Sequence, residues 1–157
     1  MSFETRLAEL GIVLPSLPKP VATYVPAAQV GDLLFLSGMI PFRDGKLAME
    51  GKLGKDVTVE QGYEMARIAL LNALSVVRHQ VGTLDRVRRV ARMVGYVASA
   101  EGFVQQPAVI DGASDLLVAV FGDAGQHARV ALGAAELPLN APVEIELIIQ
   151  VSRSPAV

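Results

Sequence analysis

Apolar and polar residues alternate along the C-terminal run 143–152, which predicts a β-strand. The odd-numbered positions up to Val151 are apolar, whereas the even-numbered ones include Glu144 and Glu146. Since successive side chains of a strand point to opposite faces of its sheet, both acids lie on the face turned away from the core. A second strand is predicted over 128–136, and a turn rich in proline separates the two.

Three segments carry apolar residues at helical spacing. One opens with the capping-box sequence Thr-Val-Glu-Gln and is predicted over 58–81, ending at Gly82. Another is predicted over 106–121, with proline in its first turn and Gly122 after its end. A short helix is predicted over 2–10, capped by a serine.

The remaining predicted strands cover residues 23–30, 32–38 and 87–98. The continuous apolar run Leu33–Leu36 is typical of a strand that is covered on both faces. The Asp44-Gly45 pair predicts a hairpin turn. Residues 11–20 hold three prolines and are read as an irregular arm on the surface. The order of elements, strands, helix, strand, helix, strands, predicts a two-layer α+β domain.

The length predicts one domain over 1–157, with the helix and the arm in 1–20 and the core in 21–152. Apolar residues make up 52 % of the chain and the mean hydropathy is +0.42. No apolar run approaches the roughly 18 residues of a membrane span, so the surplus of apolar surface indicates a subunit interface. The absence of cysteine excludes thiolate metal sites and cysteine nucleophiles, and no export signal is visible, which favours a cytoplasmic protein.

Charged residues inside the apolar terminal strands are the first candidates for a site, because a buried charge is costly unless it is paired. Arg129 has the fork geometry that binds a carboxylate, and Glu144 follows it by fifteen positions. A salt bridge for the arginine and a solvated strand face for the acid are the structural alternatives. His127 stands two residues before the arginine and is a further candidate for proton transfer, with a structural role as its alternative.

These residues and two earlier motifs together resemble the RidA/YjgF family of enamine/imine deaminases. Tyr24 in ATYVPA and Ser37-Gly38 in LFLSGMIP match its N-terminal motifs, and the Arg–Glu spacing with a Leu-Pro between matches its C-terminal ones. The resemblance covers about residues 20 to 152. Ala131 stands where the family often has cysteine, and Met39 where it often has glutamine. The longer arm and the phrase IDGASDLL resemble a less characterised branch.

The resemblance implies a chorismate-mutase-like α+β fold: a mixed sheet of about six strands with two helices on one face, assembled as a homotrimer with sites between subunits. It implies hydrolysis of 2-enamino or 2-imino acids to 2-oxo acids and ammonia, without a metal or organic cofactor. The residue roles that it implies are substrate-carboxylate binding by Arg129, activation of water by Glu144, main-chain contact to the imine nitrogen near Ala131, and a site lined by Tyr24, Ser37 and Gly38.

Two alternatives on the same fold stay open. The first is a trimeric small-molecule-binding or regulatory protein without turnover. The second, weaker one is a chorismate mutase, which needs more cationic side chains than the sequence places around a site. The arginine run at 86–92 suggests nucleic-acid binding as a further reading. However, the run lacks the interleaved aromatic residues that stack on bases, and the net charge of the chain is −2, so a solvated strand start is favoured. The expected partners are therefore a small carboxylate and further copies of the chain, and neither a membrane nor a nucleic acid.

Overall fold

The computed structural model of the chain describes residues 2–17 and 23–153. Within these ranges the α-helices are α1 (Phe3–Glu9), α2 (Val59–Val81) and α3 (Gln106–Phe121). The strands are β1 (Ala27–Val30), β2 (Leu33–Leu36), β3 (Phe42–Arg43), β4 (Lys46–Leu47), β5 (Val87–Ala98), β6 (Ala128–Ala134) and β7 (Val143–Val151). The 3-10 turns are η1 (Leu84–Arg86), η2 (Gly122–Gly125) and η3 (Pro138–Asn140). The helical segments and β5 therefore lie where the hydrophobic pattern predicts them.

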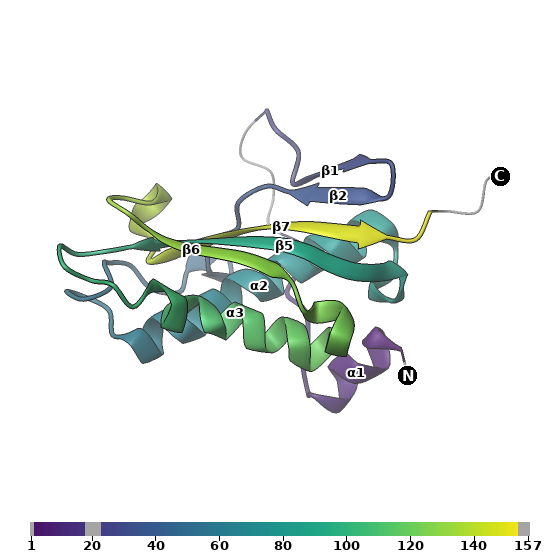
Figure 1. The fold of residues 1–157 in the computed structure, drawn as a ribbon, viewed down its shortest axis with the longest axis horizontal. Helices are drawn as coiled ribbons and strands as arrows, with labels where there is room; N and C mark the ends of the chain where they lie inside the picture. The colour runs from purple at the N-terminus through teal and green to yellow at the C-terminus, as the bar shows by residue number, and fades with distance from the viewer. Residues whose placement is uncertain (1, 18–22, 154–157) are drawn as a thin grey trace.

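One mixed sheet and a helix layer make up the fold, with α2 and α3 on the same face of the sheet (Figure 1). The strand order is β1-β2-β7-β5-β6, and only the β5–β6 pair is parallel. The expected sheet of about six strands is thus corrected to five in the described residues. The short β3 and β4 form a separate hairpin around Asp44 and Gly45, whose φ angles are 52° and 76°. The predicted Asp-Gly turn is confirmed.

The core lies between the sheet and the two long helices. In β7 the apolar side chains at Val143, Ile145 and Ile149 are fully buried, so the predicted alternation of the strand is confirmed. The predicted capping box of α2 is also present, with its side-chain and backbone bonds both formed. Helices α2 and α3 approach closely at Gly112, where a Cβ atom would overlap the carbonyl oxygen of Tyr63. This contact sets a close spacing between α3 and α2.

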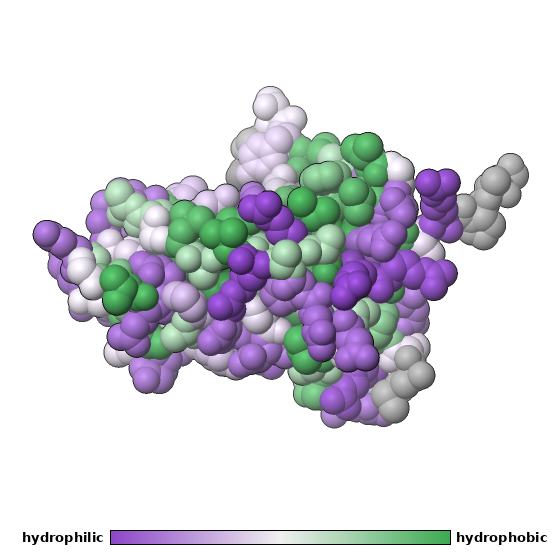
Figure 2. Space-filling view, in the orientation of Figure 1, coloured by the Kyte–Doolittle hydropathy of each residue, from purple (hydrophilic) through white to green (hydrophobic). Residues whose placement is uncertain are grey.

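The other face of the sheet is open within this chain. Cross-strand pairing places Val30, Phe35, Val130 and Leu132 on it, and these side chains are 68 %, 40 %, 40 % and 38 % exposed. Figure 2 shows apolar residues gathered over β1 and β2, with polar residues predominating over the helices. Among the described helices, none has the length and apolar character to cross a membrane. The high hydropathy of the chain therefore resides partly on an open sheet face.

In the N-terminal third, two expectations are modified and one is confirmed for the described residues. Within the described residues of one chain, the run Leu33–Leu36 is covered on one face, since Phe35 on the other face is 40 % exposed; a second cover would have to come from outside these residues. The first two strands are shorter than expected, since regular pairing begins at Ala27 and ends at Leu36. Residues 12–17 form neither helix nor strand, as expected for the arm, and 18–20 lie outside the described residues.

Candidate functional site

The register of β7, β5 and β6 decides which candidate residues share a face of the sheet. Tyr96 of β5 pairs with Glu144 on one side and Leu132 on the other, so these three side chains lie on the open face. Met93 pairs with Leu147 and Arg129, which places the arginine on the helix face. Within one chain the structure therefore separates Arg129 from Glu144 by the thickness of the sheet.

Glu144 is the most unusual carboxylate on the open face. It is half-buried, and among the described residues its oxygens accept no hydrogen bond and meet no cation at ion-pair distance. A Cβ atom at Gly38 would overlap Oε1, so the carboxylate lies directly against the glycine backbone. Burial, and then the negative charge of Glu146, raise the pKa of Glu144 above its usual value. An unpaired acid of raised pKa is suited to exchange protons with a bound molecule.

The Ser37-Gly38 turn is anchored next to this acid. Met39 and Ile145 exchange backbone hydrogen bonds of 2.8 and 2.9 Å, which fixes the turn against β7. The hydroxyl of Ser37 donates to the carbonyl oxygen of Val25 at 2.7 Å. Tyr24 is the preceding residue and is 63 % exposed. The structure thus brings the serine, the glycine and Glu144 together, with the tyrosine in the segment that the serine holds.

Arg129 belongs to a polar network between β6 and α3. Its Nη1 donates to Oδ1 of Asp111 at 2.7 Å and to Oγ of Ser114 at 3.1 Å. His127 lies beside it, with Nε2 at 3.0 Å from Oγ of Ser114 and Nδ1 at 2.6 Å from the carbonyl oxygen of Gly125. The strand-end salt bridge considered for the arginine is therefore present, and His127 joins the same network.

Ala131 lies two residues after the arginine on the same face of β6, where it packs against the core. Because β6 is an edge strand of the sheet, its outer main-chain groups face away from the other strands.

Asp111 and Ser114 were missed as candidates from the sequence. Their signal was the phrase IDGASDLL, in which the two polar residues stand three positions apart and share one side of α3.

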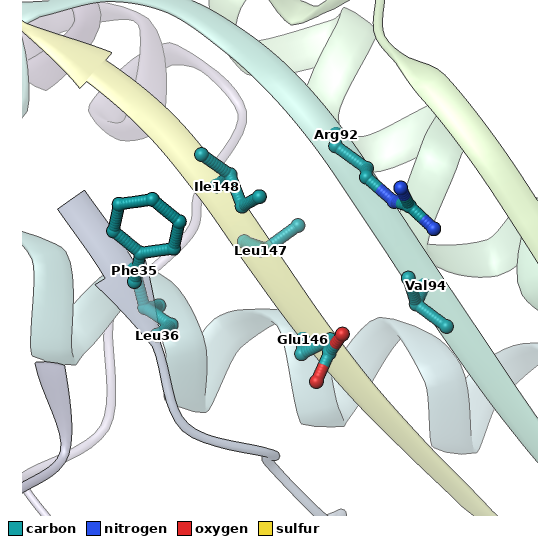
Figure 3. Close-up of a pocket in the computed structure, with 7 residues that line it drawn as sticks. All are labelled: Phe35, Leu36, Arg92, Val94, Glu146, Leu147 and Ile148. Carbon is teal, nitrogen blue, oxygen red and sulfur yellow. The ribbon is translucent and has the colours of Figure 1, made fainter. Parts of the chain in front are cut away.

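A shallow hollow of about 110 Å³ opens on the same face as Glu144 (Figure 3). Its lining is Phe35, Leu36, Arg92, Val94, Glu146, Leu147 and Ile148. Tyr96 stands next to this region, and its pKa is raised by burial and then by the negative charges of Glu146 and Glu144. The open face therefore combines an apolar floor with two acids. Within the described residues no three His, Asp or Glu side chains are placed to hold a metal ion.

Known proteins resemble this chain over most of its length. A family model described as "YjgF/chorismate_mutase-like, putative endoribonuclease" matches residues 4–151. Protein TCP17 of Trypanosoma cruzi is 40 % identical over 94 % of this chain and 92 % of its own. A 2-iminobutanoate/2-iminopropanoate deaminase of Dermatophagoides farinae is 31 % identical over 88 % of this chain and 93 % of its own.

The same similarity holds for solved structures. The crystal structure of a protein of unknown function from Agrobacterium tumefaciens superposes with a TM-score of 0.89, at 43 % identity over 96 % of this chain and 92 % of that one. The fold is thus the YjgF chorismate-mutase-like fold that the resemblance implied. On the family match across 4–151, the chain belongs to the RidA/YjgF family.

Proposed function

We propose that the chain is a hydrolytic deaminase that converts 2-imino acids, and the enamines in equilibrium with them, to 2-oxo acids and ammonia. The observation that carries the proposal is Glu144, a half-buried carboxylate without a partner among the described residues, seated on the backbone of Gly38. Burial raises its pKa, which favours a group that both takes and returns a proton during the reaction. The deaminase named among its relatives supports the same chemistry.

The reaction needs one water and no redox partner. The oxygen of water bonds to the carbon of the protonated imine while a proton of that water moves to the carboxylate of Glu144, which gives a carbinolamine. The protonated glutamate then delivers that proton to the nitrogen. The carbon–nitrogen bond breaks, the hydroxyl proton passes to the departing ammonia, and the 2-oxo acid and ammonium leave with Glu144 ionised again. Arg129 binds the substrate carboxylate through two parallel hydrogen bonds, and main-chain groups of β6 near Ala131 contact the nitrogen.

We further propose that the site forms between chains of a homotrimer. Arg129 and Glu144 lie on opposite faces of one sheet, so a single chain cannot present both to one small molecule. The edge strand that carries the arginine and the open face that carries the glutamate are both available to a second copy. The exposed apolar residues of that face favour burial in a closed, cyclic assembly.

The proposed activity is tested with a dehydratase that releases 2-aminoacrylate, by following pyruvate formation. Adding the purified chain is expected to accelerate pyruvate release. Arg129→Ala is expected to lower kcat/KM at least about a hundredfold, because two hydrogen bonds to a charged group are lost. Arg67→Ala, which removes an arginine of α2 paired with Glu64, is the control and is expected to keep full activity. An unaccelerated reaction, or an active Arg129→Ala, would refute the proposal.

The proposed assembly is tested by two identical substitutions at similarly exposed valines. Val130 is on the open face and 40 % exposed, whereas Val118 is on α3 and 44 % exposed. Val130→Glu is expected to convert the trimer to monomers, because it buries an unpaired charge between subunits. Val118→Glu is expected to leave the trimer intact. Light scattering after size-exclusion chromatography gives the masses, and equal masses for the two variants would contradict the arrangement.

A binding protein without turnover is the second candidate, and one observation favours it. Asp111 holds only Nη1 of Arg129, at 2.7 Å, and Glu144 lies on the opposite face of the sheet, so the arginine can bind a carboxylate without the acid taking part in chemistry. Such a protein is expected to bind a 2-oxo acid in calorimetry and to leave 2-aminoacrylate decay unchanged.

A further inference from the structure

The guanidinium of Arg129 is held at one end only. Both hydrogens of Nη1 are used, one by Oδ1 of Asp111 and one by Oγ of Ser114. The remaining three N–H groups, on Nε and Nη2, bond to no described residue. Nε and Nη2 lie side by side and form the parallel pair that a carboxylate binds. The network therefore occupies one nitrogen and leaves the two-point edge available.

The hydroxyl of Ser114 is oriented by His127. A carbonyl oxygen can only accept, so in a neutral ring the 2.6 Å contact to Gly125 places the single ring proton on Nδ1. Nε2 then accepts the hydroxyl hydrogen of Ser114 at 3.0 Å. This leaves the lone pairs of Ser114 to accept from Arg129, as the 3.1 Å contact requires. The direction of each bond follows from the one before it.

The carbonyl group of Gly125, which accepts the first of these hydrogen bonds, is fixed by packing. Gly125 is buried, and a Cβ atom there would overlap the carbonyl oxygen of Leu117, so η2 lies directly on α3. Asp111 and Ser114 project from the same helix, three residues apart. Both partners of Arg129 are therefore carried by α3, and the carbonyl group that bonds His127 belongs to η2, which packs directly on that helix.

We propose that Asp111, Ser114 and His127 are positioning residues, which lock the guanidinium of Arg129 so that its Nε–Nη2 edge is presented to the substrate carboxylate. The proposal rests on the carboxylate-binding role proposed for Arg129. It gives a role to Asp111 and Ser114 of IDGASDLL, which take no part in the proposed chemical steps. It also explains why the salt bridge to Asp111 is compatible with an anion site: the acid fixes the arginine at Nη1 and does not cover the edge that binds.

A direct test measures the order of the guanidinium in the full-length protein. In wild type the Nε–H of Arg129 is expected to give a distinct NMR resonance with restricted motion. Asp111→Ala and Ser114→Ala are expected to broaden or average that resonance, and Asp111→Asn, which keeps an acceptor oxygen, is expected to preserve it. Asp115→Ala, on the same helix but bonded to Tyr63, is the matched control. Unchanged order in Asp111→Ala would overturn the proposal.

The functional test separates binding from chemistry, with pyruvate as the probe of carboxylate affinity. Asp111→Ala is expected to weaken pyruvate binding about tenfold and to raise KM for the imino-acid substrate by the same factor, since a hydrogen bond to a charged group is lost. The kcat is expected to stay within about twofold, because the loss affects bound substrate and transition state equally. Asp111→Asn is expected to recover most of the affinity, and His127→Asn, which keeps only the bond to Gly125, is expected to lose part of it.

The two proposals fail in different ways. Wild type that binds pyruvate but does not hydrolyse imines removes the proposed deaminase, while the pyruvate affinities still decide the positioning role. An unchanged Kd in Asp111→Ala overturns the positioning role even in an active enzyme. A tighter Kd overturns it too, because it would make Asp111 a competitor for the arginine rather than its support.

Discussion

Glu144→Gln is expected to lower kcat about 10²- to 10⁴-fold, the range for loss of a general acid–base group. The same change is expected to raise the melting temperature at pH 7.5. Burial and Glu146 raise the pKa of Glu144, so the folded state holds its proton more tightly than the unfolded one. As pH rises from below 4.5, the usual value, the unfolded state ionises first and folding loses stability. Glutamine has no charge to desolvate and escapes this loss.

The gap in melting temperature between the variant and wild type is therefore expected to grow as pH rises through and above 4.5, and to close at lower pH. Thermal melts across this range, paired with the pyruvate assay, measure both effects. Gain of stability with loss of activity is typical of a residue kept for function. A variant that is less stable than wild type at pH 7.5 would instead make the carboxylate a structural group.

Glu146→Gln is the matched control, two residues along the same face of β7. It removes a neighbouring negative charge that raises the pKa of Glu144. The enzyme is expected to stay active, and the acid limb of its pH–rate profile is expected to move to lower pH, because Glu144 then ionises more readily. An unmoved limb would mean that Glu144 does not set it.

The local patterns of the chain predicted much of the fold. Period-two alternation identified β7 and the faces of its residues, and the capping box identified the start of α2. These signals act within one element, where side-chain direction follows directly from sequence spacing. The phrase around Asp44 and Gly45 predicted its hairpin for the same reason, since both residues adopt positive φ.

The relation of Arg129 to Glu144 was not accessible to that reasoning. Parity can be followed along a strand, but comparing β6 with β7 requires their register, and β5 lies between them. The pairing of Met93 with both Leu147 and Arg129 is a tertiary fact. The second cover expected for the run Leu33–Leu36 is a related case, because an apolar run does not reveal whether that cover comes from the same chain or from another. The face on which Arg129 lies and the cover over Phe35 are both set by residues distant in the sequence or in another chain.

If the proposed homotrimer forms, two inactive variants are expected to restore activity when they are mixed in one assembly. If Arg129 of one chain acts with Glu144 of the next, Arg129→Ala and Glu144→Ala each disable every site of their own homotrimer. After co-refolding at equal amounts, a site has an intact arginine in half of the cases and an intact glutamate in half. About a quarter of the sites, and so about a quarter of wild-type kcat, should return in a cyclic assembly.

Because Arg129 and Glu144 lie on opposite faces of one sheet, this experiment distinguishes a site shared between chains from a site within one chain. A site built within one chain has no route to recovery, because every chain in the mixture lacks one of the two groups. Mixing the two proteins without unfolding them is the control, and it is expected to remain inactive as long as the trimers do not exchange subunits. Pyruvate release from 2-aminoacrylate measures the recovered fraction. A co-refolded mixture that stays as inactive as its components would place Arg129 and Glu144 in separate sites and remove the shared one.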